Sequence, residues 1–268
     1  MELELRFEFG KNWSKYLNSL TEEKVQEALV SLQKFLQIID IENKTFIDVG
    51  SGSGLFSLAA KILGARVTSF DYDLDSVNCT KFLKEKYNIK NDWDICQGSI
   101  LDDDFIKKRG QFDIVYSWGV LHHTGQMFHA FENVSTLVRS DGYLFISIYN
   151  DQGRASERWK WIKKTYNNSN FFIRSILILY TFIRFWGISI LKDTLKGNPF
   201  KSWMNYGKND RGMTAYHDLI DWVGGYPFEV AKPEDVFQYF KSKDFTLEKM
   251  KTYCGGISCN EYLFRKNK

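Results

Sequence analysis

Short apolar runs alternate with helix-like stretches between residues 45 and 149. The apolar runs are rich in β-branched and aromatic residues, and the stretches between them carry apolar residues at helical spacing. This pattern predicts strands at 45–50, 65–70, 93–98, 112–118 and 142–149, and helices at 54–63, 74–87 and 126–138. Strands that alternate with helices in this way indicate a parallel, doubly wound α/β sheet.

Further segments flank this core. Ser19, with Glu22 three residues later, predicts the start of a helix before the first strand. After residue 230, a helix from Pro233 to Lys241 precedes two strand-like runs around a Gly-Gly connector, which predicts an antiparallel hairpin. The predicted organisation is an N-terminal helical arm (1–44), an α/β core (45–149), a mainly helical lid insertion (150–230) and a C-terminal helix and hairpin that complete the core (231–268).

The most apolar part of the chain lies within residues 171–191 of the insertion. Arg174 and Arg184 leave nine uncharged positions between them, whereas a helix that spans a membrane needs about 20 apolar residues. We therefore predict no transmembrane segment here. The first interpretation is a buried helix of the lid. The alternative is an interfacial helix whose basic surroundings are attracted to anionic lipid, which would make peripheral membrane contact.

Alternating glycines follow the first predicted strand, in the run Asp48-Val49-Gly50-Ser51-Gly52-Ser53-Gly54. Glycine lets the backbone approach a ligand closely, and the start of the next helix supplies free N–H groups. The second strand ends on Asp71, about 20 residues further on, where open α/β sheets place a carboxylate against ribose hydroxyls. A tight turn without a ligand is the alternative for the glycines, and a solvated acid is the alternative for Asp71.

These residues, together with residues 112–123, resemble the class I S-adenosylmethionine (SAM) dependent methyltransferases over residues 40–150. The resemblance implies a Rossmann-like sheet and SAM as cofactor, with S-adenosylhomocysteine (SAH) as product. The cofactor-binding residues that it implies are Asp48, Gly50, Ser51, Gly52, Gly54, Asp71, Tyr72, Ser99, Ile100, Ser117, Trp118 and, from the N-terminal arm, Trp13. For Trp13, packing on the core is the alternative.

A methyltransferase that acts on oxygen or nitrogen gains from a general base with a pKa near neutrality, which favours histidine. His122 and His123 follow the fourth strand, at the same edge of the sheet as the glycines. We predict that one of them is the base or orients the acceptor, with His217 and Asp151 as candidates from the lid. Adjacent side chains rarely converge on one metal, and the four cysteines form no C-x-x-C pair, so we predict no metal site.

The candidate acceptor-binding residues lie in or beside the insertion and are Asn150, Asp151, Arg154, Arg211 and Tyr226. Arg211 suits a phosphate or carboxylate, with an ion pair to Asp210 or Asp218 as the alternative. Residues 9–13, 150–153 and 210–229 are similar to a bacterial subgroup associated with surface-polysaccharide modification. That similarity implies O-methylation of a sugar, a glycan precursor or a phosphorylated small molecule.

The distribution of charge indicates RNA as an alternative acceptor. Between Gln152 and Arg211, twelve basic residues stand against three acidic ones, a net charge of +9 in a chain whose total is +3. With its interleaved aromatic residues, this segment makes RNA methylation the second hypothesis, and SAM binding without catalysis is the third. We identify no module for nucleic acids and expect no DNA partner. The N-terminus lacks a signal-peptide pattern and the thiols suit a reducing compartment, so we expect a cytoplasmic protein.

Overall fold

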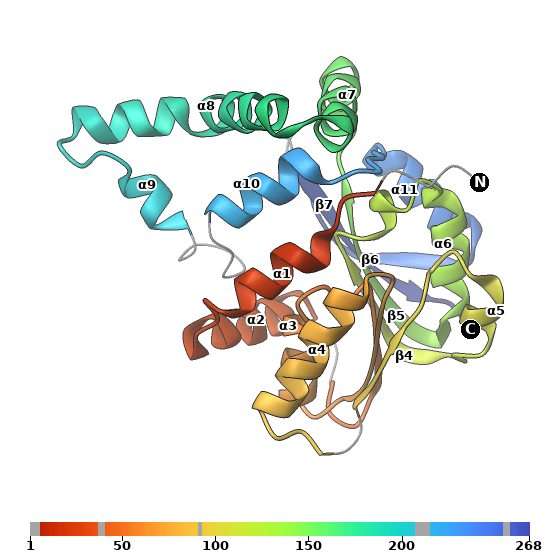
Figure 1. Ribbon diagram of the computed structural model, residues 1–268. Coiled ribbons are helices and arrows are strands. Elements are labelled where there is room, and N and C mark those ends of the chain that lie inside the picture. Colours follow the sequence, from red (N-terminus) through yellow and green to blue (C-terminus); the bar gives the residue numbers. More distant parts are fainter. Residues whose placement is uncertain (1–5, 37–40, 91–92, 207–214, 254–257) are drawn as a thin grey trace.

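The computed structural model describes residues 6–36, 41–90, 93–206, 215–253 and 258–268 of the chain (Figure 1). Within these residues, one seven-stranded sheet has the order β3-β2-β1-β4-β5-β7-β6. Strands β1 to β5 are parallel, and β7 runs antiparallel to both β5 and β6. This order confirms the predicted doubly wound sheet with an antiparallel C-terminal hairpin. The Gly-Gly connector of the hairpin lies outside the described residues.

The strands are β1 (Thr45–Val49), β2 (Arg66–Asp71), β3 (Trp93–Gln97), β4 (Phe112–Trp118), β5 (Val138–Tyr149), β6 (Phe245–Lys251) and β7 (Cys259–Lys266). Only β5 departs clearly from its predicted range, because it begins at Val138 and not at residue 142. Val138 pairs with Phe112, and the register then shifts before Ile114 pairs with Tyr143. Asp141, with a φ of 61°, lies within this irregularity.

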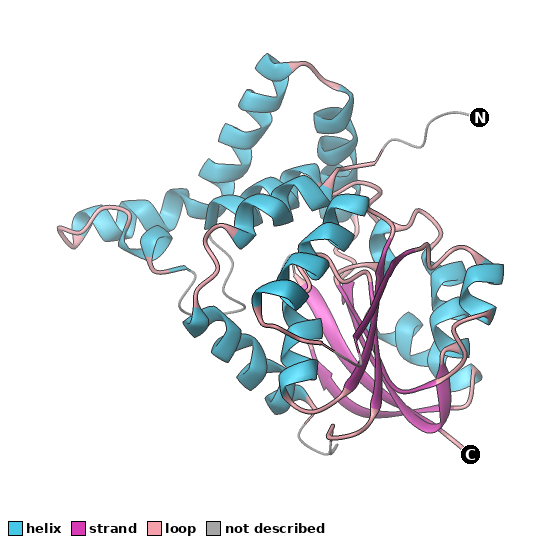
Figure 2. Ribbon diagram, turned by 60° about the horizontal axis from the view of Figure 1, so that its bottom comes forward, coloured by secondary structure: helices cyan, strands magenta, loops and turns pink. Residues whose placement is uncertain are grey.

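Helices cover both faces of the sheet (Figure 2). They are α1 (Phe9–Leu17), α2 (Glu22–Phe35), α3 (Leu55–Ile62), α4 (Leu74–Lys86), α5 (Asp103–Lys107), α6 (Met127–Thr136) and α11 (Pro233–Ser242). Phe46 of β1 packs in a core with α2, α3 and α4, whereas the next residue, Ile47, packs in a second core with α6 and α11. This alternation of side chains along a strand buries β1 on both faces.

The insertion between β5 and α11 contains α7 (Arg154–Asn168), α8 (Phe171–Leu195), α9 (Lys201–Met204) and α10 (Ala215–Gly224). Trp159 of α7 and Val223 of α10 belong to a third core that also contacts α8. Helix α8 extends away from the sheet (Figure 1), and only its Thr181 and Asp193 are buried. The interpretation of this run as a buried helix is therefore wrong. Among the described helices, α8 alone is long and apolar enough to cross a membrane, judged by length and composition.

Candidate functional site

The glycine loop leaves β1 in a conformation that only glycine adopts easily. Gly50, Gly52 and Gly54 have φ angles of 79°, 54° and 79°, in the left-handed region that disfavours other residues. A Cβ atom on Gly50 would lie 2.5 Å from the methyl groups of Val120. The backbone N–H groups of Gly50 and Ser51 donate to the Phe70 carbonyl at 2.9 and 3.1 Å. These hydrogen bonds fix the loop against the end of β2.

Asp71 joins this loop to the end of β2. Its Oδ2 accepts the N–H of Gly52 at 2.9 Å, and its Oδ1 accepts the N–H of Asp73 at 2.9 Å. Burial raises the pKa of Asp71 to about 6, so the group is ionised at neutral pH. Each carboxylate oxygen has a second lone pair, and the two together suit the paired hydroxyls of a ribose.

Asp48 supports the loop from within the sheet. Its Oδ2 accepts the hydroxyl of Ser57 at 2.5 Å, and Ser57 accepts the hydroxyl of Ser69 at 2.8 Å. The indole N–H of Trp93 then donates to Ser69 at 2.8 Å. Burial raises the pKa of Asp48 to about 7. This chain of hydrogen bonds links β1, α3, β2 and β3, and it holds the carboxyl group of Asp48 below the glycines.

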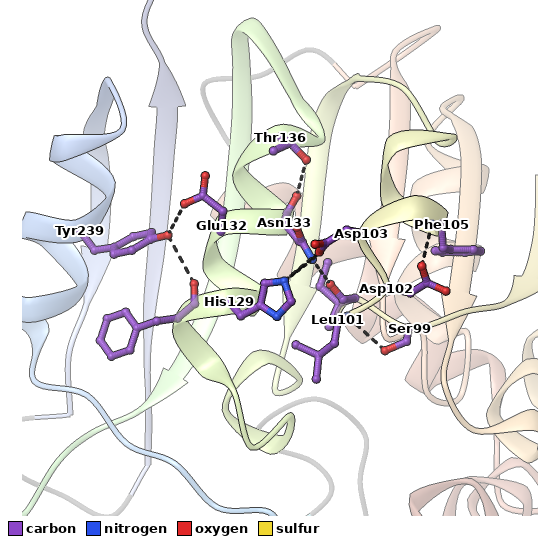
Figure 3. A network of polar contacts seen from close by, with 12 residues as sticks. Ser99, Leu101, Asp102, Asp103, Phe105, His129, Glu132, Asn133, Thr136 and Tyr239 are labelled. Carbon is purple, nitrogen blue, oxygen red and sulfur yellow. Dashed lines mark hydrogen bonds and ion pairs between the residues drawn. The ribbon is translucent and has the colours of Figure 1, made fainter.

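A polar network fixes the loop that follows β3 (Figure 3). Asn133 of α6 donates to the carbonyl of Ile100 at 2.8 Å and to Asp103 Oδ1 at 2.8 Å. His129 lies 2.8 Å from the same carboxylate oxygen, while the Ser99 hydroxyl accepts the N–H of Leu101 at 3.1 Å. Asn133 therefore positions the loop that carries Ser99 and Ile100, two residues that the resemblance assigns to the cofactor.

Helix α1 covers the glycine loop. The backbone N–H of Gly10 donates to Asp73 Oδ2 at 2.9 Å, and the indole Nε1 of Trp13 is 3.0 Å from the position that a Cβ on Gly52 would take. Nearby, the guanidinium of Arg6 lies 4.4 Å above the ring of the exposed Tyr72. Trp13 lies against the glycine loop, and both Trp13 and Tyr72 line the cavity described below.

One cavity of about 1070 Å³ collects most of the predicted cofactor residues. It is lined by Trp13, Asp48, Gly50, Ser51, Gly52, Asp71, Tyr72, Ser99, Ile100 and Trp118. Gly54 and Ser117 are outside this lining: Gly54 is the N-cap of α3, and the buried hydroxyl of Ser117 donates to the Val49 carbonyl at 3.1 Å. Both residues therefore stabilise the loop without lining the cavity. The lining combines the backbone of the glycine loop, a carboxylate and aromatic rings, and these features fit a nucleoside with an amino-acid tail.

The three candidate histidines occupy different environments. His123 lines the cavity, and its Nδ1 is 2.6 Å from the carbonyl of Pro227. A carbonyl only accepts, so Nδ1 carries the proton and Nε2 is the basic nitrogen. Burial, with a contribution from Lys163, lowers the pKa of His123 to about 3. His122 is buried behind it, 4.0 Å from the ring of Tyr149, and His217 on α10 is also outside the lining.

The four predicted acceptor residues that the structure describes do not line the cavity. Asn150 accepts from the amide of Asn260 at 3.1 Å, and Asp151 accepts the N–H of Gly153 at 2.8 Å. Both therefore shape the entry into α7, where Arg154 is exposed. Tyr226 packs against the third core. Arg211 lies outside the described residues.

Helix α10 supplies cavity residues that the sequence analysis missed. Asp218, Asp221 and Trp222 line the cavity together with Tyr149 and Tyr206. Tyr206 donates to Asp218 at 2.7 Å, and the amide of Asn12 donates to Asp221 at 2.7 Å. Two acids three residues apart on a helix share one face, and this spacing was the signal available in the sequence.

Asp221 shares a buried environment with Lys163 of α7. The ammonium of Lys163 donates to the Trp222 carbonyl and lies 4.2 Å above the Trp222 ring. Burial raises the pKa of Asp221 to about 8 and lowers the pKa of Lys163 to about 7. These opposite shifts place both groups close to their protonation midpoints at neutral pH.

Comparison with known proteins agrees with this geometry. A family model described as a methyltransferase domain matches residues 21–180, more than half of the chain. A ubiquinone biosynthesis O-methyltransferase from Glaesserella parasuis is 30% identical over 117 residues, which cover 42% of this chain and 48% of the relative. A ribosomal protein L11 methyltransferase from Streptococcus uberis is 28% identical over 138 residues, which cover 50% of this chain and 39% of the relative. The chain thus aligns with less than half the length of either relative.

The fold extends further than this sequence similarity. A crystal structure of magnesium protoporphyrin IX methyltransferase from Synechocystis with bound SAH matches with a TM-score of 0.56 and 13% identity, covering 96% of this chain and 94% of that one. The Rossmann-like fold is therefore confirmed well beyond the aligned core. Taken with the glycine loop, Asp71 and the family model, it identifies the chain as a member of the class I methyltransferase family, with SAM as its cofactor.

Proposed function

We propose that this protein is an O-methyltransferase whose acceptor is a small hydroxylated molecule, with a sugar or glycan precursor as the leading class. The observation that carries the proposal is the end of the cavity formed by α10. Asp218, Asp221 and His123 lie there beside Tyr149 and aromatic rings. The carboxyl oxygens of the two acids and the unprotonated nitrogen of a neutral histidine accept hydrogen bonds, so this end favours a ligand rich in hydroxyl donors.

The acidic character of this end favours an uncharged hydroxylated acceptor over a phosphorylated one. Asp218 and Asp221 line the cavity, and the buried Lys163 beside Asp221 donates to the Trp222 carbonyl. Arg6 also lines the cavity, but its guanidinium donates to the Thr124 carbonyl and lies over the Tyr72 ring. The similarity to a ubiquinone biosynthesis O-methyltransferase is consistent with oxygen as the acceptor atom. The association with surface polysaccharides extends the same proposal and rests on motif similarity.

In the proposed reaction, SAM supplies an activated methyl group when bound. The chain aligns the acceptor oxygen with this group and accepts the hydroxyl proton, and alignment supplies much of the rate. Asp221, with a pKa of about 8, accepts that proton in its ionised form, whose population rises as pH approaches 8. His123, whose Nδ1–H is directed at the Pro227 carbonyl, presents Nε2 to a second hydroxyl and orients the acceptor.

The first experiment measures methyl transfer from radiolabelled SAM to monosaccharides, nucleotide sugars, sugar phosphates, phenols and RNA, after calorimetry has established SAM binding. We expect product with an uncharged sugar-type acceptor. With that acceptor, Asp221→Asn should lower turnover by about 100-fold, because a positioned base contributes 10²–10⁴-fold. Its SAM affinity should be unchanged.

Asp141→Asn changes an acid near the opposite end of β5 from the cavity-lining Tyr149. It is the matched control and should leave turnover unchanged. Methylation of RNA alone, with a steep dependence of binding on salt, would replace the proposal by the RNA hypothesis. SAM binding without product from any acceptor class would favour a non-catalytic SAM-binding protein.

A further inference from the structure

Helix α8 exposes a continuous set of large apolar side chains. Phe172, Ile176, Leu179 and Ile183 are exposed by 72%, 51%, 57% and 59%, and their spacing places them on one face of the helix. Further along, Ile188 and Leu195 are exposed by 69% and 81%. Soluble domains rarely leave so many neighbouring apolar side chains in water, and such patches mark interaction surfaces.

The opposite face of α8 is attached to the rest of the protein. Leu177, Ile178 and Phe185 pack against the third core, and the ring of Phe185 lies 5.6 Å from that of Trp222. Trp186 contacts Trp203 of α9 with ring centroids 5.0 Å apart. One side of the helix thus packs against α7, α9 and α10, and the outer face that carries Phe172, Ile176, Leu179 and Ile183 remains for a partner.

The outer surface of this arm, defined as α8 and α9 with the segment between them (171–204), is cationic as well as apolar. Its exposed basic residues are Arg184, Lys192, Lys196 and Lys201, with Lys160 and Lys164 on the adjacent α7. The guanidinium of Arg174 instead donates to the carbonyls of Tyr166 and Asn167 at 2.9 and 3.1 Å. The single acid of the arm, Asp193, is buried and accepts the N–H and hydroxyl of Ser202 at 2.6 and 3.0 Å. The carboxylate of Asp193 is therefore occupied within the arm and does not lie on its surface.

We infer that the arm docks the protein on the surface of an anionic phospholipid membrane, with the outer face of α8 in the interface and its lysines and arginines at the headgroups. An amphipathic helix with basic flanks binds such a surface through apolar burial and charge together. A second copy of this chain is a poorer occupant, because a face-to-face pair would bring the same cations together. The inference does not depend on the identity of the acceptor.

The same contacts oppose a helix that crosses the membrane. Arg184 lies near the middle of the 25-residue helix, where a charge at the bilayer centre is costly. Thr181 is buried and Phe185 packs on Trp222, so the helix cannot be surrounded by lipid without losing the third core. If the helix lies in the plane of the membrane interface, its outer face can contact lipid while its inner face stays packed on the third core.

The test is flotation of the full chain with vesicles of phosphatidylcholine alone or mixed with phosphatidylglycerol. We expect binding to the anionic vesicles, weaker binding at high salt, and little binding to the neutral ones. Ile176→Gln with Ile183→Gln should weaken binding at least about tenfold, since two apolar side chains no longer enter the interface. Arg184→Gln with Lys192→Gln should weaken binding to the anionic vesicles specifically.

The matched control is Val30→Gln with Ile62→Gln, which changes two aliphatic residues that are exposed by 60% and 47% on other helices. It should bind vesicles as the unmodified protein does, and every variant should retain its SAM affinity as proof of folding. Failure to float with anionic vesicles would overturn the inference. So would a dimer that the α8 variant dissociates, which would assign the face to a second copy, or retention in vesicles after carbonate washing, which would indicate a spanning helix.

Discussion

At the scale of single residues, the cofactor end depends on a few positions with a stringent physical requirement. Gly52 combines a φ of 54° with the Trp13 indole 3.0 Å from the position of its missing Cβ. Asp71 accepts two backbone N–H groups, one from each of two loops. At both positions the side chain, or its absence, determines the shape of the loop as well as contact with a ligand.

Replacing Gly52 by Val should abolish measurable SAM binding in calorimetry. A β-branched residue in the left-handed region costs on the order of 1–2 kcal/mol, and the new side chain would collide with Trp13. Gly110→Val is the control, because Gly110 has a φ of 75° with no atom within 4 Å of its missing Cβ. That variant should lose similar stability but keep its affinity. Equal loss of affinity in both would assign the effect to general strain.

Asp71→Ala should weaken SAM binding by about 100-fold, since hydrogen bonds to a charged group contribute about 1.5–3 kcal/mol and 1.4 kcal/mol is a factor of ten. Asp94→Ala removes an exposed acid of β3 whose ion pair with Arg109 spans 3.7 Å, and it should leave the affinity unchanged. Titration of both variants with SAH measures these affinities. Wild-type affinity in Asp71→Ala would exclude a ribose contact by this residue.

The raised pKa of Asp221 predicts a pH dependence of stability. Between pH 5 and 7 the folded state keeps a proton on Asp221, whose pKa is about 8, while the unfolded chain has lost it. The folded state therefore binds more protons, and stability falls as pH rises through this window. Lys163, with a pKa of about 7, begins to lose its proton in the folded state alone as pH approaches 7, which opposes this fall both in the unmodified protein and in the Asp221→Asn variant. Urea unfolding at pH 5 and pH 7 should show a smaller decrease for Asp221→Asn than for the unmodified protein.

At the scale of elements, the sequence predicted the core much better than its attachments. The five parallel strands are short runs of apolar, β-branched residues buried on both faces, and this pattern is typical of buried strands. Helix α1 was missed because its nine residues include Gly10 and lack a capping side chain. Its helical state depends on contacts with α4 and α10, which are remote in sequence. The predicted cap at Ser19 was wrong because Thr21 accepts the N–H of Lys24 at 3.5 Å.

Within the candidate site, too, the cofactor residues were easier to predict than the acceptor residues. The cofactor residues follow strands in the core, so their spacing along the chain fixes their position at the sheet edge. The acceptor residues depend on how the insertion folds back, and this brought Asp218 and Asp221 to the cavity in place of Asn150 and Asp151. Pairing of α10 with α1 and α7 leaves no periodic signal in the sequence, so the lid could not be predicted from it.

Asn133 makes a prediction at the scale of elements, because it joins α6 to the loop after β3. Asn133→Ala should release the Ile100 carbonyl and the Asp103 carboxylate and weaken SAM binding by about tenfold through loss of loop order. Thr136→Ala, in the next turn of α6, removes only a hydrogen bond of its own helix and serves as control. The affinity for SAH, which carries the same adenosine, should fall to the same extent. An unchanged affinity for both ligands would show that the loop is ordered without Asn133.

At the scale of the whole molecule, the sheet and its helices form a cofactor-binding unit to which the insertion adds a second face of the cavity and an exposed arm. Each part has its own core, and the third core joins α7, α8 and α10 through Trp159 and Val223. The arm is held by this third core and not by the sheet. Changes on its outer face should therefore leave the cofactor end intact.

SAM should stabilise the molecule as a whole, because it binds the folded chain and not the unfolded one. At a concentration one hundred times its dissociation constant, the free energy of unfolding should rise by about 2.7 kcal/mol. Thermal unfolding with and without ligand measures this change, and adenosine at the same concentration is a weaker-binding comparison. The absence of any shift at saturating SAM would contradict binding at a preformed site.

Helix α1 contacts both ends of the cavity at once. Gly10 donates to Asp73 beside the glycine loop, and two residues later Asn12 donates to Asp221 beside the proposed acceptor. A ligand that orders α1 from one end therefore prepares the other end, and thermodynamic reciprocity requires the effect to be mutual. We expect the cofactor and the acceptor to bind with positive cooperativity. The factor by which SAH tightens the acceptor should equal the factor by which the acceptor tightens SAH, and Asn12→Ala should bring both towards one.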